Sequence, residues 1–276
     1  MRSTDAEVHD LRLGGGLVRL RFAGPALLPC VLSAFGHVHA GRKGAERPVL
    51  TIEMWDGAST GVLPPAFPLG GSEVPVRGET RIYADAGVST LFHGGVHPRD
   101  GTFEAITIFD ERNSVARYFL TAPDTISWYE RAAPLRGVLH WGLGRPDRLL
   151  VHAGAVGMGG SVVLLAGRAG SGKSTTAVAS LLAGHDYLGD DYVLVDLRDS
   201  RPVAHSLYAT AKLTPAATAL LPALPDTYRR PPAHDAKKHV LDISRLRPGG
   251  VRTSAAVVAI VLPRLSPGGA TRLRRT

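Results

Sequence analysis

The first part of the chain alternates short apolar runs with polar turns, the spacing of half-buried β-strands. Residues 17–22 interleave leucine, valine and phenylalanine with arginine, which predicts a strand with one buried face. Similar runs predict strands at 49–55, 81–84, 89–93, 103–109 and 115–121, the last two joined by a polar hairpin loop at 110–113. Residues 25–39 favour a helix, and residues 58–76, rich in proline and glycine, favour a loop. We expect a small α+β domain over residues 1–122.

A connector at 123–124 precedes a different pattern. Residues 134–143 have apolar positions at helical spacing, while the apolar runs 149–156 and 162–166 predict two strands joined by a glycine turn at 157–160. Residues 174–183 predict a helix that Gly184 would end in a left-handed conformation. Strands are expected again at 193–195, 238–243 and 255–262. The fold class predicted is α/β, with a mixed sheet in a second domain over residues 123–276.

Composition narrows the range of functions. A chain of 276 residues with 44% hydrophobic content can form one large or two modest domains, and it has no apolar run long enough to span a bilayer. The first residues lack the apolar segment of a signal peptide, and Cys30, the single cysteine, fits a core position. A cytoplasmic location without a membrane partner is therefore predicted. The net charge of +8 could attract nucleic acid or an acidic peptide, or it could reflect a solvated basic surface and tail.

Residues 167–174 read G-R-A-G-S-G-K-S, which fits the phosphate-binding P-loop pattern G-x-x-x-x-G-K-[ST]. An apolar run precedes the motif and a predicted helix follows it, the context that distinguishes a P-loop from a chance glycine turn. Backbone amides of the glycines and the helix N-terminus would bind phosphate oxygens, Lys173 would reach the β- and γ-phosphates, and Ser174 would face Mg²⁺. The candidate nucleotide-binding residues are Gly167, Gly170, Ser171, Gly172, Lys173, Ser174 and Thr175.

Two adjacent aspartates, Asp190 and Asp191, precede the apolar run 193–195. Near a P-loop, one carboxylate can hold Mg²⁺ and the other can accept a proton from an attacking hydroxyl, although a polar turn would also explain the pair. Asp196, at the end of the same run, is the position that an ordinary Walker B ATPase would use. His37, His39, His93 and His97 do not complete a familiar metal-ligand spacing.

Three segments together resemble the catalytic domain of HPr kinase/phosphorylase: H-A-G-A-V at 152–156, L-L-A-G-R-A-G-S-G-K-S at 164–174 and L-G-D-D at 188–191. The resemblance implies an HPr-kinase-like P-loop domain that uses ATP and Mg²⁺ to phosphorylate a serine. It implies that Asp190 activates the acceptor hydroxyl, that His152 and Asp191 support it, and that Ser174 and Asp191 hold the metal. His152 could also be a core histidine of the apolar run that contains it.

The chain departs from that family after the aspartate pair, where no glutamate-containing segment follows. Residues 205–213 instead resemble the HPr-kinase-like enzymes of lasso-peptide and other modified-peptide pathways, which implies a peptide or small-protein acceptor recognised by the first domain. Lys212 in this segment could stabilise charge in the transition state, or it could be an exposed lysine. Residues 221–238 have little periodicity and predict a mobile flap whose Arg229, Arg230, Lys237 and Lys238 could meet phosphates.

Two other functions stay open at this stage. A nucleotide-dependent switch or ATPase without an acceptor would release phosphate to water. A nucleic-acid-binding ATPase would follow from the charge alone, but the chain has no aromatic and basic interleaving to support it, so nucleic acid is not the expected partner. A homo-oligomer is possible on either reading.

Overall fold

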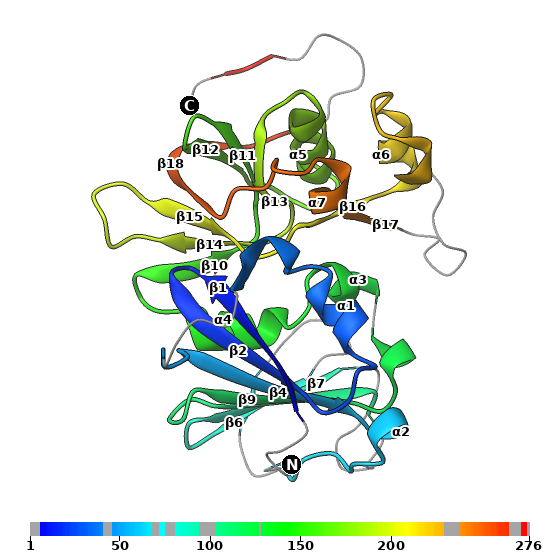
Figure 1. Cartoon of the computed structure of the whole chain (residues 1–276). Coiled ribbons are helices and arrows are strands. Elements are labelled where there is room, and N and C mark those ends of the chain that lie inside the picture. The colour runs from blue at the N-terminus through cyan, green and yellow to red at the C-terminus, as the bar shows by residue number, and fades with distance from the viewer. Residues whose placement is uncertain are drawn as a thin grey trace.

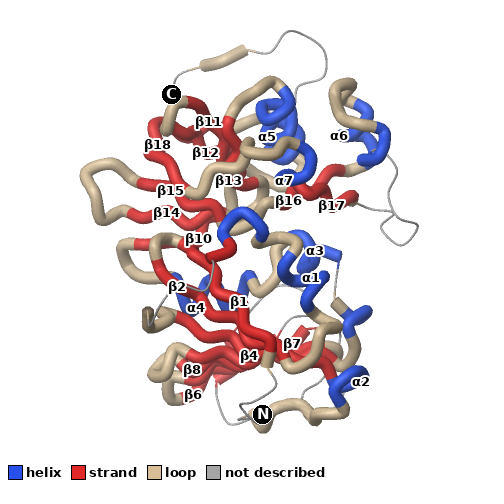
Figure 2. Tube along the Cα trace, in the orientation of Figure 1, coloured by secondary structure: helices blue, strands red, loops and turns tan. Residues whose placement is uncertain are grey.

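The computed structural model of the chain describes residues 6–40, 46–67, 72–74, 81–93, 103–126, 128–228, 238–264 and 272–274. These residues form a mixed α/β protein with three sheets and short helices (Figure 1, Figure 2). A nine-stranded sheet from the first part of the chain occupies one half, and a seven-stranded sheet from the second part occupies the other. Within the described residues, no helix combines the length and apolar character needed to cross a bilayer.

The nine-stranded sheet has the order β3-β1-β2-β4-β9-β8-β7-β6-β5. Two of its pairings, β2 with β4 and β4 with β9, are parallel, and the others are antiparallel. Its strands are β1 (Glu7–Leu13), β2 (Gly16–Phe22), β3 (His39–Ala40), β4 (Leu50–Asp56), β5 (Ser72–Val74), β6 (Arg81–Asp85), β7 (Val88–His93), β8 (Ala105–Asp110) and β9 (Val115–Leu120). All the strands predicted in this region are therefore confirmed, and β1, β3 and β5 are additional.

The helix expected over residues 25–39 is wrong in extent. The structure has only α1 (Leu28–Leu32) and a 3-10 turn, Gly36–Val38, before β3 begins. Pro29 can stand at a helix start but Gly36 disfavours continuation, so the apolar pattern of this segment packs as two short pieces. The loop expected over 58–76 also contains structure at its ends, where α2 (Gly57–Thr60) and β5 lie.

The seven-stranded sheet has the order β10-β14-β15-β18-β12-β11-β13 and contains one parallel pair, β12 with β18. Its strands are β10 (Arg148–Val151), β11 (Gly154–Met158), β12 (Ser161–Leu165), β13 (Asp186–Gly189), β14 (Val193–Asp196), β15 (Val203–Ser206) and β18 (Ser254–Val261). The mixed sheet and the antiparallel hairpin of β11 with β12, which leads into the P-loop, are confirmed.

The single strand expected over residues 149–156 is wrong. The chain breaks at His152 and Ala153, where the Ala153 amide donates to the Val151 carbonyl at 3.0 Å. The two halves then pair with different neighbours, β10 with β14 and β11 with β12 and β13. His152 consequently lies in a turn between two strands, not within one.

Helices cover one side of the seven-stranded sheet (Figure 1). The longest is α5 (Lys173–Leu182), which confirms the helix expected after the P-loop, and Gly184 follows it with a φ of +100°. A small separate sheet pairs β16 (Thr210–Leu213) with β17 (His239–Asp242). The remaining helices of the second part are α3 (Trp128–Ala132), α4 (Arg136–Leu143), α6 (Pro215–Ala219) and α7 (Ile243–Leu246), with 3-10 turns at Pro123–Thr125 and Asp226–Tyr228.

One hydrophobic core joins the two large sheets. It contains side chains of β1, β2, β4 and β9 together with Leu139 and Leu143 of α4 and Leu194 of β14, and Cys30 packs at its margin. The division expected at residues 122 and 123 stays a prediction. The change from one sheet to the other falls between β9 and β10, but α4 packs with the strands of the first sheet.

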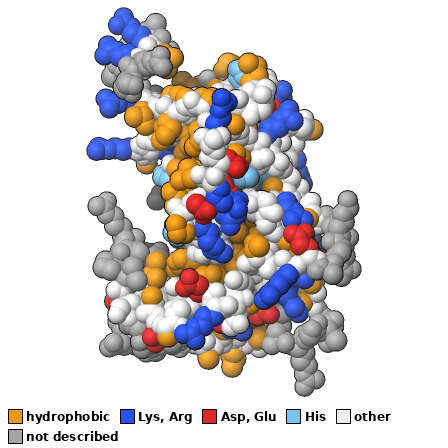
Figure 3. All heavy atoms as spheres, turned by 90° about the vertical axis from the view of Figure 1, so that its left-hand side faces the viewer, with side chains coloured by type: hydrophobic (Ala, Val, Ile, Leu, Met, Phe, Trp, Pro, Cys, Tyr) orange, Lys and Arg blue, Asp and Glu red, His pale blue; other side chains and the backbone are white. Residues whose placement is uncertain are grey.

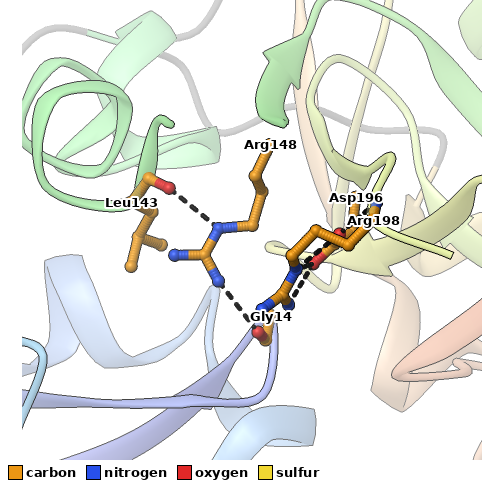
Figure 4. A network of polar contacts seen from close by, with 5 residues as sticks. All are labelled: Gly14, Leu143, Arg148, Asp196 and Arg198. Carbon is orange, nitrogen blue, oxygen red and sulfur yellow. Dashed lines mark hydrogen bonds and ion pairs between the residues drawn. The ribbon is translucent and has the colours of Figure 1, made fainter. Parts of the chain in front are cut away.

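Arg148 of β10 fastens this junction (Figure 4). Its Nε donates to the Leu143 carbonyl at 2.9 Å, and its Nη1 donates to the Gly14 carbonyl at 3.2 Å in the β1–β2 turn. A Cβ on Gly14 would lie 2.4 Å from a methyl group of Leu194, so only glycine lets the turn approach β14 this closely. The second half of the molecule is thus held against the first by packing and by directed hydrogen bonds.

Candidate active site

The P-loop lies between β12 and α5 in a conformation suited to binding an anion. Gly167, Gly170 and Gly172 have φ angles of +144°, +79° and +97°, which side chains with a Cβ rarely adopt. Gly172 caps α5 without any side-chain hydrogen bond, so no side chain satisfies the first amides of the helix there. The loop therefore presents backbone donors and the positive end of a ten-residue helix.

The ammonium group of Lys173 is folded into this loop. The residue is 6% exposed, and its Nζ donates to the Gly167 carbonyl at 2.8 Å and to the Arg168 carbonyl at 3.1 Å. Both contacts are to neutral backbone oxygens. Phosphate oxygens could take their place and would also compensate the positive charge of the ammonium group. Ser174 and Thr175 follow in the first turn of α5, where both are partly buried, and the Oγ of Ser171 is buried without a hydrogen-bond partner in the described structure.

Asp190 is the member of the aspartate pair that lies beside Ser174 of the P-loop helix. It directly follows β13, is 3% exposed, and accepts a hydrogen bond through Oδ2 from the Lys212 amide at 2.9 Å. Burial and the neighbouring charge of Asp191 raise its pKa to about 6, against the opposing effects of the Lys212 amide and the Ser174 hydroxyl. Its Oδ1 is buried and makes no hydrogen bond within the described residues. One carboxylate oxygen is thus available for a further group.

Asp191 lies between two basic side chains. Lys212 of β16 forms an ion pair with its Oδ2, and the Nε2 of His152 lies 3.6 Å from its Oδ1. Burial alone would raise the pKa of Asp191, but the nearby His152 ring and the charge of Lys212 outweigh it and hold the pKa well below the usual range. The pair therefore combines one carboxylate that is readily protonated with one that stays ionised.

These side chains come from four separate segments: the turn before β11, the start of α5, the residues after β13, and β16. The structure brings Asp190, Asp191, His152, Lys212 and Ser174 into one cluster. The resemblance implies this proximity for four of them, and Lys212 joins them from β16. Their roles in catalysis, nucleotide binding and metal binding stay predictions. The expectation that Lys212 might be an exposed lysine is wrong, because its side chain is 10% exposed.

A pocket opens beside the aspartate pair. It lies where the segment before α4 meets β16: the Tyr208 hydroxyl donates to the Pro134 carbonyl at 3.0 Å, and the Thr210 hydroxyl donates to the Ala132 carbonyl. Its lining residues are Ala132, Asp190, Asp191, Tyr192, Tyr208, Thr210, Ala211 and Lys212. Sequence reasoning missed the contributions of Tyr192, Tyr208 and Thr210. Tyr192 is adjacent to the aspartates, and Tyr208 and Thr210 lie in the segment 205–213 that also contains Lys212, so the available signal was nearness in the sequence to the predicted site residues.

The structure does not favour Asp196 as a metal ligand. It ends β14, at the opposite end of this strand from the aspartate pair, and forms a bidentate ion pair with Arg198 (Figure 4). Hydrogen bonding from Arg198 lowers the pKa of Asp196 to about 2. Five residues of extended chain correspond to about 16 Å, which places this carboxylate far from Asp191.

The histidines of the first part do not assemble a metal site within the described residues. The Nε2 of His37 is hydrogen-bonded to the Ser206 hydroxyl at 2.7 Å, and burial lowers the pKa of His37 to about 4. His39 contacts His9, with 3.0 Å between ring nitrogens. His97 lies outside the described residues.

The flap expected over residues 221–238 is wrong for its first part. Leu221 and Leu224 are 5% and 2% exposed and pack in the core beneath α5, and residues Asp226–Tyr228 form a 3-10 turn. The two buried leucines hold the segment against the core. The sequence shows no sign of this packing because the segment has no helical or strand periodicity. Residues 229–237 lie outside the described residues.

Charge on the surface is mixed in sign. On the face drawn in Figure 3, basic and acidic side chains stand side by side among hydrophobic and neutral groups. Several arginines are paired with carboxylates, as in Arg12 with Glu46 at 2.7 Å and Arg252 with Asp186 at 2.9 Å. In Figure 3 several basic side chains gather at the upper left of the view, whereas both signs are mixed in its middle and lower parts, and the choice of partner stays a prediction.

Comparison with known proteins gives one kind of match. No protein-family model matches the chain, and no curated protein matches it. Among solved structures, it is similar to the HPr(Ser) kinase/phosphatase from Coxiella burnetii, with 16% identity and a TM-score of 0.29 over 43% of this chain and 71% of that chain. A likeness this small carries no argument about activity, so the case for function rests on the site itself.

Proposed function

We propose that this protein is an ATP- and Mg²⁺-dependent kinase that transfers the γ-phosphoryl group to a serine hydroxyl of a peptide or small protein. The observation that carries the proposal is the position of Asp190: a buried carboxyl with one unpartnered oxygen, beside Ser174 of the P-loop helix and lining a small pocket. A carboxylate placed beside a phosphate cradle suits transfer to an acceptor hydroxyl that it can deprotonate.

The P-loop would hold the phosphates of ATP. Backbone amides of the loop and the N-terminus of α5 would donate to these phosphates, and Lys173 would exchange its two carbonyl contacts for phosphate oxygens. Such donors are already in place before the reaction, so they stabilise developing negative charge without reorganisation.

The residues present fit a magnesium ion. The Ser174 hydroxyl and the Asp191 carboxylate, which stays ionised because of Lys212 and His152, are the oxygen donors that Mg²⁺ prefers. When bound, Mg²⁺ would supply positive charge that offsets the negative charge of the phosphates.

Asp190 would accept the proton of the acceptor serine. The serine oxygen attacks the γ-phosphorus, the bond from the γ-phosphorus to the β–γ bridging oxygen breaks, ADP leaves, and the serine proton moves to the unpartnered Oδ1. A carboxyl whose pKa is near 6 is ionised at neutral pH and is still basic enough to take this proton. Lys212 adds a positive charge next to the transferring group.

The acceptor class also belongs to this proposal. The resemblance of residues 205–213 to kinases of modified-peptide pathways favours a precursor peptide, including the lasso type. Composition favours a cytoplasmic location, and a homo-oligomer stays open.

The test is a transfer assay with ATP labelled at the γ-phosphorus. Purified protein is incubated with Mg²⁺ and with the precursor peptide encoded beside its gene or a serine-peptide library, and labelled peptide and free phosphate are both measured. We expect label on a serine peptide, none on its serine-to-alanine copy, and none with Lys173→Ala. Free phosphate with no labelled peptide would instead favour an ATPase or switch.

A further inference from the structure

Tyr192 joins the catalytic cluster to the first half of the molecule. Its ring stacks on the His152 ring, with 5.1 Å between centroids and 23° between planes. Arg136 of α4 lies over the same tyrosine, with its Cζ 5.2 Å from the ring centroid, and its Nη1 donates to the tyrosine hydroxyl at 3.0 Å. Tyr192 also packs against the core shared by the two large sheets.

His152 needs such a support. Its side chain is 49% exposed, and its Nε2 is 3.6 Å from Asp191, longer than a well-formed hydrogen bond. An exposed ring at the end of a broken strand can turn away from its partner unless another group limits its rotation. The stacked tyrosine covers one face of the imidazole and is the aromatic contact that His152 makes in the described structure.

Arg136 is held in place by packing that belongs to the first sheet. Helix α4 buries Leu139 and Leu143 completely, and a Cβ on Gly142 would lie 2.7 Å from Leu50 of β4, so the helix is pressed against that strand. Leu135, directly before Arg136, is 2% exposed and has a φ of +61°, a costly conformation for leucine that the surrounding core maintains. The direction in which Arg136 leaves the helix start is therefore fixed by the core.

We propose that Tyr192 and Arg136 are positioning residues: Arg136 orients Tyr192, and Tyr192 holds His152 against Asp191, so that the first sheet helps to set the geometry of the aspartate pair. The expected effect on the transfer rate rests on the proposed kinase function, whereas the expected effect on the position of the His152 ring does not. Groups that orient a site residue typically change activity about 10- to 100-fold when removed.

The structural consequence is tested by NMR on protein labelled at histidine ring carbons. A stacked tyrosine shifts the ring protons of His152 upfield through its ring current. We expect Tyr192→Leu to abolish this shift, Tyr192→Phe to keep most of it, and Arg136→Ala to reduce it. A His152→Gln sample assigns the resonance. Identical His152 shifts in wild type and Tyr192→Leu would overturn the proposal, whatever the protein catalyses.

The kinetic consequence is tested with the same variants in the transfer assay. Tyr192→Leu should lower kcat about 10- to 100-fold while the Kd of ATP measured without Mg²⁺ changes less than about 2-fold, and Tyr192→Phe should lose far less. Because Arg136 acts through Tyr192, the double variant Arg136→Ala/Tyr192→Leu should be no slower than Tyr192→Leu alone. Equal losses in kcat and in nucleotide affinity, or additive losses in the double variant, would contradict the proposal.

The two proposals fail in different ways. If wild type transfers no phosphate to any acceptor but shows the ring-current shift and its dependence on Tyr192, the kinase function fails and the positioning contact stands. If wild type is active and Tyr192→Leu retains full kcat, the positioning role fails and the kinase function stands. If Tyr192→Leu does not fold, Arg136→Ala decides the matter, because this arginine is exposed and its removal leaves the core intact.

Discussion

Replacement of Asp190 by asparagine should remove phosphoryl transfer and also change how stability depends on pH. Asparagine has nearly the same shape and keeps an oxygen that can accept the Lys212 amide hydrogen bond. It cannot take the serine proton, so transfer should fall about 10²- to 10⁴-fold with little change in nucleotide affinity. It also cannot ionise, which removes a buried charge at neutral pH.

The size of the stability effect follows from the pKa of Asp190. Burial raises this pKa from 3.8 to about 6, so the folded protein keeps a proton that the unfolded chain releases between these values. Stability contributed by the protonated carboxyl is therefore complete below about pH 3.8 and is lost as the pH rises through 6. The difference corresponds to about 3 kcal/mol in the free energy of unfolding.

The measurement is urea unfolding of wild type and Asp190→Asn at several pH values between about 3.5 and 8. We expect the free energy of unfolding of wild type to fall relative to that of the variant by about 3 kcal/mol across this range. The asparagine NH₂ group would stand where Oδ1 now lies, buried without a hydrogen-bond partner, and this costs about 1–3 kcal/mol. The cost is the same at every pH and cancels in the comparison.

Asp191→Asn is the matched control because it should behave in the opposite way. The pKa of Asp191 is held low, so its ionised carboxylate stabilises the fold at pH values above the ordinary pKa of an aspartate. Asparagine at this position removes the charge that pairs with Lys212. Parallel pH curves for wild type and Asp190→Asn would refute the buried, perturbed carboxyl. Full transfer activity in Asp190→Asn would refute its role as the base.

Four further changes test other parts of the structure. Lys173→Ala should abolish transfer and leave the melting temperature within a few degrees of wild type, as measured by circular dichroism, because its contacts are to loop carbonyls; near-normal turnover would mean that the loop does not bind phosphate. Asp196→Asn should retain transfer in the peptide assay, and loss of activity there would restore the Walker B alternative. Arg198 lowers the pKa of Asp196 to about 2, so the ionised carboxylate stabilises the fold at neutral pH and this stability is lost as the pH falls through about 2. In urea titrations, Arg198→Gln should therefore reduce the difference between the free energies of unfolding at about pH 7 and about pH 2; an unchanged difference would show that the ion pair contributes nothing. Leu224→Ala should cost about 2–5 kcal/mol in urea unfolding, since the side chain is 2% exposed, and a neutral result would return this segment to the class of surface flaps.

Local patterns in the sequence determined the elements whose stability is local. Strands 17–22, 49–55 and 115–121, the hairpin of β11 with β12, and the helix after the P-loop could be predicted, because side-chain periodicity and turn residues act over neighbouring positions. The P-loop and the aspartate pair were visible for the same reason, since each motif is contiguous in the chain.

Tertiary structure decided everything that depends on distant segments. The run at 149–156 reads as one strand, but it divides at His152 because its two halves find partners at opposite parts of the sheet, β14 for one and β12 with β13 for the other. Lys212 could have been a surface lysine until β16 placed it on Asp191. Arg136 carries no local signal at all, because its contact with Tyr192 joins residues 56 positions apart. Sequence patterns report which side chains face a common side of one element, whereas a site assembled from four elements is fixed only when the core packs them together.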